Sequence, residues 1–313
     1  MSAGRVGSVL GAALGRAGHT LVAASAISTA SVRRAETLLP GVPLLPPDET
    51  VRAADLVLLA IPDDALAGMV GGLVNAGALR AGQIVVHTSG AYGVDVLGLA
   101  AELGALPLAL HPVMTFTGRH EDLERLASCC VGVTATDGDE AAWNVGEALA
   151  VEMGAEPVRV PGRARGLYHA AIAHGANHLA TLVNDTLDLL REAGIDNAER
   201  VLGPLFSAAL DNSLRRGDSA LTGPVARGDF GTVRKHRRVL ADHAPDVAPS
   251  YDTLARRTME RARAAGLLPA GAAEELEALF RSRPDGGHDP NDPHPGDLPP
   301  GDLPPDDDGR ETL

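Results

Sequence analysis

Residues 2–25 read SAGRVGSVLGAALGRAGHTLVAAS, and this stretch decides the predicted fold. It opens with a form of the motif G-x-G-x-x-G in which Ser2 stands in place of the first glycine, while Gly4 and Gly7 keep the other two. In that motif the glycines let the backbone approach a pyrophosphate and let the following helix pack closely on a strand. Apolar residues at helical spacing come next, and the apolar run 21–25 predicts a strand. This order favours a dinucleotide site; the open alternative is a helix of small residues that only packs closely.

Short apolar runs alternate with helical patterns as far as residue 160. Continuous apolar runs separated by helices are typical of a parallel sheet covered on both faces. The expected strands are residues 21–25, 56–61, 84–87, 106–110, 131–135 and 157–160, and the expected helices are residues 6–17, 65–75, 94–103 and 140–153. We therefore expect an α/β domain over residues 1–161, a Rossmann-type doubly wound parallel sheet.

Only helical patterns follow Gly162. They cover residues 167–193, 197–216, 229–243, 249–265 and 270–281. We therefore expect an all-helical domain over residues 162–281. Residues 282–313 hold eight prolines and almost nothing apolar to bury, which predicts a disordered, acidic, Pro-rich tail.

The formal net charge of -14 is unevenly distributed. Half of it lies in the predicted tail, where eight Asp and one Glu outnumber two Arg, and no basic face of domain size remains. Nucleic acid is therefore not expected as a partner, because phosphate binding needs clustered cations. No run approaches the roughly 18 apolar residues of a membrane helix, so we expect a cytoplasmic protein with no membrane partner.

No metal site is expected. Cys129 and Cys130 are adjacent and have no spaced partners for a metal or a disulfide framework. His174 and His178 have a spacing that can hold zinc on one helical face. However, Gly175 stands where a catalytic glutamate would be, and the sequence offers no evident third ligand.

The glycine motif normally follows a strand, and here only Met1 stands before the motif. In the usual strand order this first strand lies centrally, beside the second and the fourth. Either the start has been placed too late or the chain is truncated. As written, the sheet is expected to have a gap and to bind its cofactor poorly.

The predicted second strand ends at Ser25 without the acidic residue that NAD-binding proteins offer to the ribose. The next charged residues are Arg33 and Arg34, which suit a 2'-phosphate, so NADP is preferred over NAD. The open alternative is an ordinary helix start with exposed arginines. Ligands of open α/β sheets gather beyond the carboxyl ends of the strands. The residues expected to bind the cofactor are Gly4, Arg5, Val6, Gly7, Ser25, Arg33, Arg34, Ile61, Pro62, Thr88, Ser89 and Gly90.

Seven short motifs together point to a known group. They are Ile61-Pro62-Asp63, His87-Thr88-Ser89-Gly90, His111-Pro112, Tyr168-His169-Ala170-Ala171, Asn177, Leu221-Thr222-Gly223-Pro224 and Arg227-Gly228-Asp229. Over about residues 2–265 the chain resembles the Rossmann-like oxidoreductases with a C-terminal domain of unknown function. That family is similar in architecture to ketopantoate reductase, pyrroline-5-carboxylate reductase and 6-phosphogluconate dehydrogenase. The resemblance implies a nicotinamide-dependent reductase with a 6-phosphogluconate-dehydrogenase-like helical second domain, and leaves the substrate undefined.

Two residues of the helical region are candidates for catalysis. Ketopantoate reductase and 6-phosphogluconate dehydrogenase use a lysine early in their helical region. In the matching neighbourhood this chain has Arg163-Ala164-Arg165, and arginine does not deprotonate usefully, so the same acid–base chemistry is not expected here. On a helix, His169 and Asn177 fall within one stripe away from the leucine face. These side chains can donate to a carbonyl oxygen during hydride transfer. Polar contacts that only hold this helix to its neighbours explain the stripe equally well.

An anionic substrate is expected from a local excess of cations. Residues 215–238 hold seven cations and two acids in an otherwise acidic chain. Arg227 is the expected partner of a substrate carboxylate, with His111 and Thr222 as further substrate-binding residues.

The sequence therefore predicts an NADP-dependent oxidoreductase that reduces a small, anionic carbonyl or imine between its two domains. The alternative is a non-catalytic, Rossmann-derived nucleotide-binding or regulatory protein, which Ser2 and the absent lysine favour somewhat. The only expected partners are a small-molecule substrate and a second copy of the chain, bound as a homodimer through the helical domain.

Overall fold

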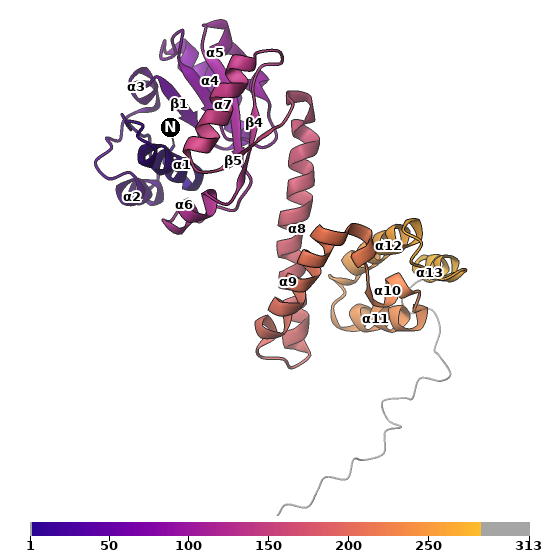
Figure 1. The fold of residues 1–313 in the computed structure, drawn as a ribbon. Coiled ribbons are helices and arrows are strands. Elements are labelled where there is room, and N and C mark those ends of the chain that lie inside the picture. Colours follow the sequence, from indigo (N-terminus) through magenta and orange to yellow (C-terminus); the bar gives the residue numbers. More distant parts are fainter. Residues whose placement is uncertain (1, 283–313) are drawn as a thin grey trace, which may run out of the picture. The chain divides into compact units, whose positions relative to one another are not determined.

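A computed structural model describes residues 2–282. These residues form two compact units, one up to Leu179 and one from Ala180, and the division falls within the long helix α8, Arg165–Glu192 (Figure 1). The predicted domain boundary after residue 161 lies just ahead of this helix. The predicted tail lies outside the described residues, except for Ser282.

The first unit is built on one five-stranded sheet. Its strands are β1 (Leu56–Leu59), β2 (Ile84–His87), β3 (Leu106–Pro112), β4 (Cys130–Thr134) and β5 (Glu156–Arg159), in the spatial order β1-β2-β3-β4-β5. The pairs β1–β2, β2–β3 and β4–β5 are parallel, which confirms the Rossmann-like class.

One strand direction differs from the expectation, because β4 runs antiparallel to β3. The connection between them contains α6 (Glu121–Leu126), a helix of six residues and so about 9 Å long. It is too short to carry the chain back along the seven residues of β3, which span about 23 Å. The chain therefore re-enters the sheet from the end at which it left.

Helices cover both faces of the sheet. They are α1 (Arg5–Arg16), α2 (Thr29–Leu38), α3 (Pro47–Arg52), α4 (Asp63–Asn75), α5 (Gly98–Glu102), α6 and α7 (Glu140–Glu152). One apolar core contains Leu10 and Leu149 from α1 and α7, and the other contains Leu66 from α4. The neighbouring residues Val85 and Val86 of β2 belong to opposite cores, as expected for a strand buried on both faces.

The strand predicted over residues 21–25 is wrong for the structure described here. Only Ala24 pairs in this segment, through a single parallel bridge to Leu44. A parallel strand is stabilised by neighbours on both sides, and the predicted first strand would be the neighbour between residues 21–25 and β1. With that position not filled by a strand, the segment keeps one bridge.

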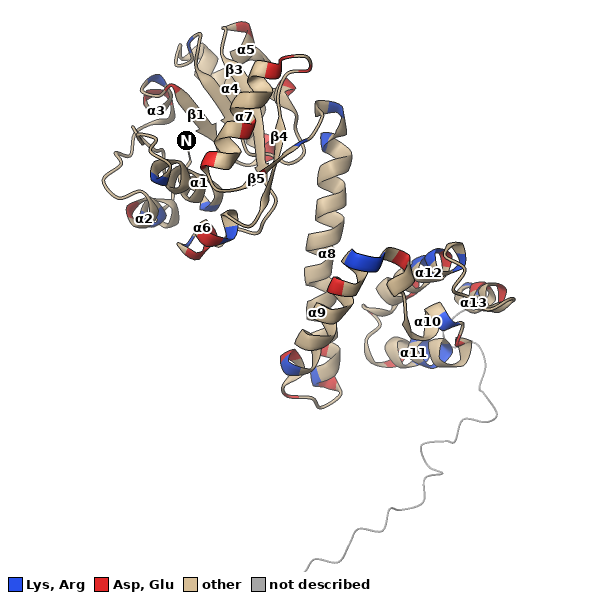
Figure 2. Cartoon of the chain, in the orientation of Figure 1, with Lys and Arg blue, Asp and Glu red and all other residues tan. Residues whose placement is uncertain are grey.

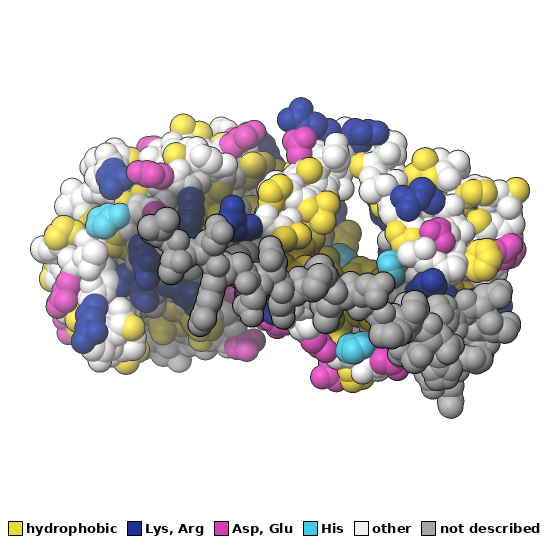
Figure 3. All heavy atoms as spheres, turned by 90° about the horizontal axis from the view of Figure 1, so that it is seen from below, with side chains coloured by type: hydrophobic (Ala, Val, Ile, Leu, Met, Phe, Trp, Pro, Cys, Tyr) yellow, Lys and Arg dark blue, Asp and Glu magenta, His cyan; other side chains and the backbone are white. Residues whose placement is uncertain are grey.

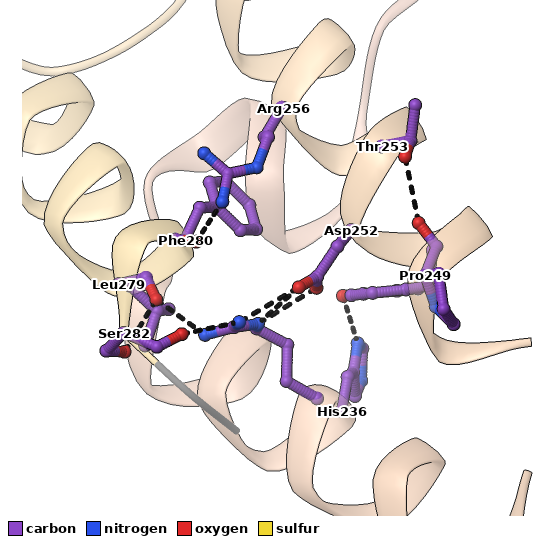
Figure 4. A network of polar contacts seen from close by, with 10 residues as sticks. His236, Pro249, Asp252, Thr253, Arg256, Leu279, Phe280 and Ser282 are labelled. Atoms are coloured by element: carbon purple, nitrogen blue, oxygen red, sulfur yellow. Dashed lines mark hydrogen bonds and ion pairs between the residues drawn. The ribbon is translucent and has the colours of Figure 1, made fainter. Parts of the chain in front are cut away.

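The second unit is helical throughout its described part. It contains the end of α8 and the helices α9 (Ala198–Arg216), α10 (Gly223–Arg227), α11 (Phe230–His243), α12 (Ala248–Ala264) and α13 (Ala272–Arg281), which confirms the predicted helical region. Its small core includes Val233, Met259, Leu276 and Phe280. The buried guanidinium of Arg237 joins α11 to α12 and α13 (Figure 4).

No helix within residues 2–282 is long and apolar enough to cross a membrane. The helix α8 carries no Lys, Arg, Asp or Glu from Gly166 to Asn184, so it is tan over most of its length in Figure 2.

Candidate functional site

The loop that follows β2 is shaped by a buried histidine. Nε2 of His87 lies 2.9 Å from the carbonyl oxygen of Gly93, and Nδ1 accepts from the backbone N–H of Ser89 at 3.2 Å. Burial lowers the pKa of His87 to about 4, and the charge of Arg165 acts in the same direction. The ring is therefore neutral at physiological pH, with its one N–H given to Gly93. This holds Thr88, Ser89 and Gly90 in a fixed loop at the carboxyl end of the strand.

Arg165 anchors the first turn of α8 to the sheet. Its side chain is buried, and it donates to Oγ1 of Thr134 at 2.7 Å and to the carbonyl oxygens of Ser89, Ala109 and Gly132 at 3.0, 3.1 and 2.8 Å. These acceptors belong to β4, to the loop after β2 and to β3. Burial lowers the pKa of Arg165 to about 10, which leaves it charged at neutral pH. Arg165 thus fixes the position of the first turn of α8 on the sheet.

The anchored turn brings Tyr168 to His111. The Tyr168 hydroxyl lies 2.8 Å from Nδ1 of His111, and the two rings meet edge to face. Gly132 makes room for this contact, since a Cβ atom there would lie 2.5 Å from the Tyr168 hydroxyl. Tyr168 belongs to a quoted motif, but its pairing with His111, 57 residues away, was not predicted.

His169 joins the same cluster from the next position of α8. Its ring stands edge to face with that of His111, with 6.0 Å between the centroids. Both rings press on Gly90, where a Cβ atom would lie 2.5 Å from Cδ2 of His169 and 2.9 Å from Nε2 of His111. The structure therefore brings together Gly90, His111 and His169, which the sequence nominated separately.

The paired side chains of the cluster are uncharged at neutral pH. Burial lowers the pKa of His111 to about 4, and Arg165 and His169 act in the same direction. Burial also raises the pKa of Tyr168. A neutral phenol can donate to Nδ1 of a neutral imidazole, and the imidazole then carries its own proton on Nε2. This arrangement can hold a proton beside Gly90 without holding a charge there.

The glycine turn lies at the end of β1. Gly4 caps α1, and a Cβ atom at Gly7 would lie 3.0 Å from Cβ of Ala60 and would clash with the carbonyl oxygen of Ser2. The turn thus lies directly beside the residue that precedes Ile61 and Pro62. The backbone N–H of Ala3 donates to the carbonyl oxygen of Ser25 at 2.7 Å. The first turn of α1 contains no acidic residue, which suits an anionic ligand at this helix end.

A loop after β3 reaches the predicted arginines. A Cβ atom at Gly118 would lie 2.6 Å from Nε of Arg34 and 2.9 Å from Cγ of Arg5, while Arg34 itself donates to the carbonyl oxygen of Ala3 at 3.0 Å. The fully buried carboxylate of Asp122 shapes this loop by accepting from the backbone N–H groups of Thr117 and Gly118 at 2.8 and 2.7 Å.

A basic hollow results from this packing. It has a volume of about 520 Å³ and is lined by Arg33, Arg34, Arg119, His120 and Glu121, among others. Figure 3 shows several arginine side chains on the face of the first unit that is turned to the viewer. Arg119 was not predicted; its signal in the sequence is the pair Thr117-Gly118 followed by Arg119-His120, a few residues after β3.

Three predicted residues lie away from this cluster. Asn177 is eight residues beyond His169, which places it about 12 Å farther along α8. Thr222 and Arg227 belong to the second unit, where Thr222 caps α10 and Arg227 ends it. Their roles toward a substrate stay predictions. Val6 packs against the core of the first unit.

Two family profiles match the chain. One is described as a Rossmann-like domain and covers residues 1–112; the other is DUF2520, a domain of unknown function, over residues 129–258. The chain carries a Rossmann-like domain and a DUF2520 domain. The DUF2520 match begins at β4, so it takes in the last two strands of the sheet together with α8, which supplies Arg165, Tyr168 and His169.

Solved structures with the same fold include a Bacteroides fragilis protein named as an NADP oxidoreductase. The two sequences are 22% identical, the match covers 83% of this chain and 96% of that chain, and the TM-score is 0.67. A Thermotoga maritima protein has 20% identity, 84% and 97% coverage and a TM-score of 0.60. An imine reductase from Streptomyces aurantiacus has 18% identity, 90% and 92% coverage and a TM-score of 0.52. No curated protein matches the Rossmann-like/DUF2520 chain.

Proposed function

We propose that this Rossmann-like/DUF2520 protein is an NADP-dependent reductase of a small, anionic carbonyl or imine. The observation that carries the proposal is the cluster of Gly90, His111, Tyr168 and His169 at the carboxyl ends of β2 and β3. In open α/β sheets this edge is where ligands bind. The backbone N–H of Thr88 donates to the carbonyl oxygen of Leu59 at 3.3 Å, which joins the loop of the cluster to the strand beside the glycine turn. Relatives in fold named as an NADP oxidoreductase and an imine reductase support the same class.

The residues of this chain supply the proton of the proposed reaction. Bound NADPH supplies a hydride to the substrate carbon, so the carbonyl oxygen or imine nitrogen must gain one proton. Tyr168 carries an exchangeable proton on its hydroxyl, and His111 carries one on its imidazole. Both side chains are uncharged before the reaction, so each holds a proton that it can donate to the substrate. Arg165 keeps the tyrosine in place through its contacts with the sheet.

Substitution of Tyr168 tests the proposal. Turnover is measured as NADPH oxidation with a panel of small oxo acids and cyclic imines, and the dissociation constant of NADPH is measured by calorimetry. Tyr168→Phe is expected to lower kcat by about 100-fold, the range of general acid catalysis, with the cofactor affinity unchanged. Tyr92→Phe, at an exposed tyrosine of the same unit, is the matched control.

Two results would count against the reductase. If Tyr168→Phe turns over as fast as the unsubstituted protein, the proton does not pass through this pair. If NADPH binds and no substrate of the panel is reduced, the non-catalytic nucleotide-binding alternative is favoured instead.

The basic hollow carries the proposed preference for NADP. Arg33 and Arg119 line it, and removing one arginine contact to a phosphate costs about 1.5 kcal/mol or more, which is about tenfold in affinity. Arg33→Ser and Arg119→Ser are each expected to weaken NADPH binding about tenfold while NADH binding changes less than twofold. Arg16→Ser, an exposed arginine at the other end of α1, is the control. Equal losses for NADPH and NADH would refute a 2'-phosphate site at this place.

A further inference from the structure

A hollow of about 480 Å³ lies in the first unit, apart from the candidate site. One wall is the helical segment formed by η1 (Val94–Leu97) and α5, and the other is formed by residues 135–137 after β4 and residues 162–163 ahead of α8. Pro107, at the start of β3, also lines it. His111 is four residues farther along that strand and so about 13 Å away. We call this space the α5 hollow.

Small and apolar residues shape the α5 hollow. Val94, Gly98 and Ala101 recur at the spacing of one helical face, and all three line the hollow. A Cβ atom at Gly98 would meet nothing within 4 Å. The reversed strand β4 supplies the facing loop, because it runs back along β3 and the chain then continues into residues 135–137. The apolar part of the wall consists of Val94, Ala101, Pro107 and Ala135.

Three charged side chains line the α5 hollow without a protein partner. Asp95, Asp137 and Arg163 are exposed, and within residues 2–282 none of these side chains makes a hydrogen bond or an ion pair. Elsewhere in the first unit Arg52 and Arg159 pair with nearby carboxylates. In the α5 hollow, opposite charges line one space and stay too far apart to pair. All three groups are therefore open to a ligand.

These charges indicate the class of ligand. A guanidinium group binds a carboxylate through two parallel hydrogen bonds, and a carboxylate accepts from an ammonium group. The apolar wall suits an aliphatic chain between such groups. Two aspartates and one arginine give the lining a formal charge of -1, so a ligand with one net positive charge matches it. The volume is within the range of small-molecule sites.

The α5 hollow adjoins the anchor of α8. Arg163 is two residues ahead of Arg165, whose buried guanidinium holds the first turn of α8 on the sheet. Cα of Gly162 would lie 3.4 Å from a Cβ atom at Gly93, and the carbonyl oxygen of Gly93 lies 2.9 Å from Nε2 of His87. A ligand in the α5 hollow therefore contacts the segment that leads into α8.

We propose that the α5 hollow binds a free amino acid with two ammonium groups, whose carboxylate contacts Arg163 and whose ammonium groups contact Asp95 and Asp137. The apolar wall holds the aliphatic chain between these groups. The ligand joins η1 to the segment ahead of α8, two parts of the chain that only the fold brings together. This inference stands on the α5 hollow and does not depend on the proposed reductase.

Titration calorimetry of the full chain with L-lysine tests the site, and two analogues separate its contacts. L-Norleucine lacks the second ammonium group and cadaverine lacks the carboxylate, so each is expected to bind about tenfold more weakly than lysine. Arg163→Gln is expected to weaken lysine binding about tenfold and not to weaken cadaverine binding. Absence of lysine binding, norleucine binding as tight as that of lysine, or lysine binding unaffected by Arg163→Gln would each overturn the proposal.

A matched pair of acidic residues separates the site from a general attraction of cations. Asp95→Asn is expected to weaken lysine binding about tenfold. Glu102→Gln removes the same charge from an exposed residue of α5 that does not line the hollow, and is expected to change the affinity less than twofold. Both aspartate and glutamate are exposed, so neither change is expected to unfold the chain. Equal losses in the two variants would overturn the proposal.

Gly98→Leu closes the α5 hollow without removing a charge. Gly98 has helical dihedral angles, φ -52° and ψ -43°, which a leucine also adopts, and the place of its Cβ atom is open. The variant is expected to lose lysine binding at least about tenfold, with a melting temperature no lower than that of the unsubstituted protein. Lysine binding of unchanged affinity in Gly98→Leu would place the ligand outside the α5 hollow and overturn the proposal.

Discussion

Replacing Arg165 by methionine is expected to lower the free energy of unfolding of the first unit by at least about 3 kcal/mol. The substitution leaves Oγ1 of Thr134 and three buried carbonyl oxygens without their donor. Each buried acceptor that loses its partner costs about 1–3 kcal/mol, and a methionine that fills the space recovers only part of this sum. The same change frees the first turn of α8, so Tyr168 is expected to lose its hydrogen bond to His111.

The single tryptophan of the chain makes this measurement specific. Trp143 is buried in α7 of the first unit, so its fluorescence in a urea titration reports on that unit. Arg163→Met is the matched control, since Arg163 is exposed and only two residues away. Arg165→Lys is expected to recover less than half of the loss, because an ammonium group cannot reproduce the fork of the guanidinium. A loss below about 1 kcal/mol for Arg165→Met would show that the four bonds do not stabilise the unit.

Replacing Arg237 by methionine is expected to destabilise the second unit by about 3–5 kcal/mol. Arg237 is 4% exposed; its Nε and one terminal nitrogen lie 2.9 Å from the two carboxylate oxygens of Asp252 (Figure 4). It also donates to the carbonyl oxygens of Leu279 and Ser282, at 2.5 and 3.0 Å, where α13 ends. Removing one partner of a buried ion pair leaves the other charge unpaired, which is the costly case.

Hydrogen exchange of α11, α12 and α13 measures the effect, because no tryptophan lies in this unit. Arg234→Met, at an exposed arginine of the same helix, serves as control. The double substitution Arg237→Met with Asp252→Asn is expected to cost less than Arg237→Met alone, since it removes the unpaired carboxylate. If the two variants lose equal protection, the ion pair is not the source of the stability.

The sequence predicts the elements whose signal is local. β2 and β3 are continuous apolar runs, and their positions are confirmed within two residues. Residues 21–25 carry the same signal, yet they lack one neighbour and so make a single bridge. The predicted parallel direction of β4 was wrong. Hydrophobic periodicity indicates which side chains of a strand are buried but not the direction in which the strand runs, and here the direction depends on the length of α6.

The candidate site was predicted in pieces. Gly90, His111 and His169 were named from strand ends and from a helical stripe, but only the fold brings them into contact. The sequence showed Arg165 only as a residue near the place of a lysine in two other dehydrogenases. Its role as an anchor was not predicted, because its four acceptors come from segments between 31 and 76 residues away in the chain. Arg119 escaped notice because the loop that carries it is built by Asp122, a residue with no motif of its own.

The reversed strand β4 also brings a cysteine to the candidate site. Because β4 starts where β3 ends, Cys130 lies beside the end of β3 and its carbonyl oxygen accepts from Val113. Cys130 lies two residues before Gly132 on β4, and a Cβ atom at Gly132 would lie 2.5 Å from the Tyr168 hydroxyl, so Cys130 shares the face of the strand that Tyr168 meets. Burial raises the pKa of Cys129, so it remains a neutral thiol. A parallel strand would have delivered its first residues to the opposite edge, and Tyr168 would have faced different neighbours; here a cysteine lies on the face of β4 that the Tyr168 hydroxyl meets.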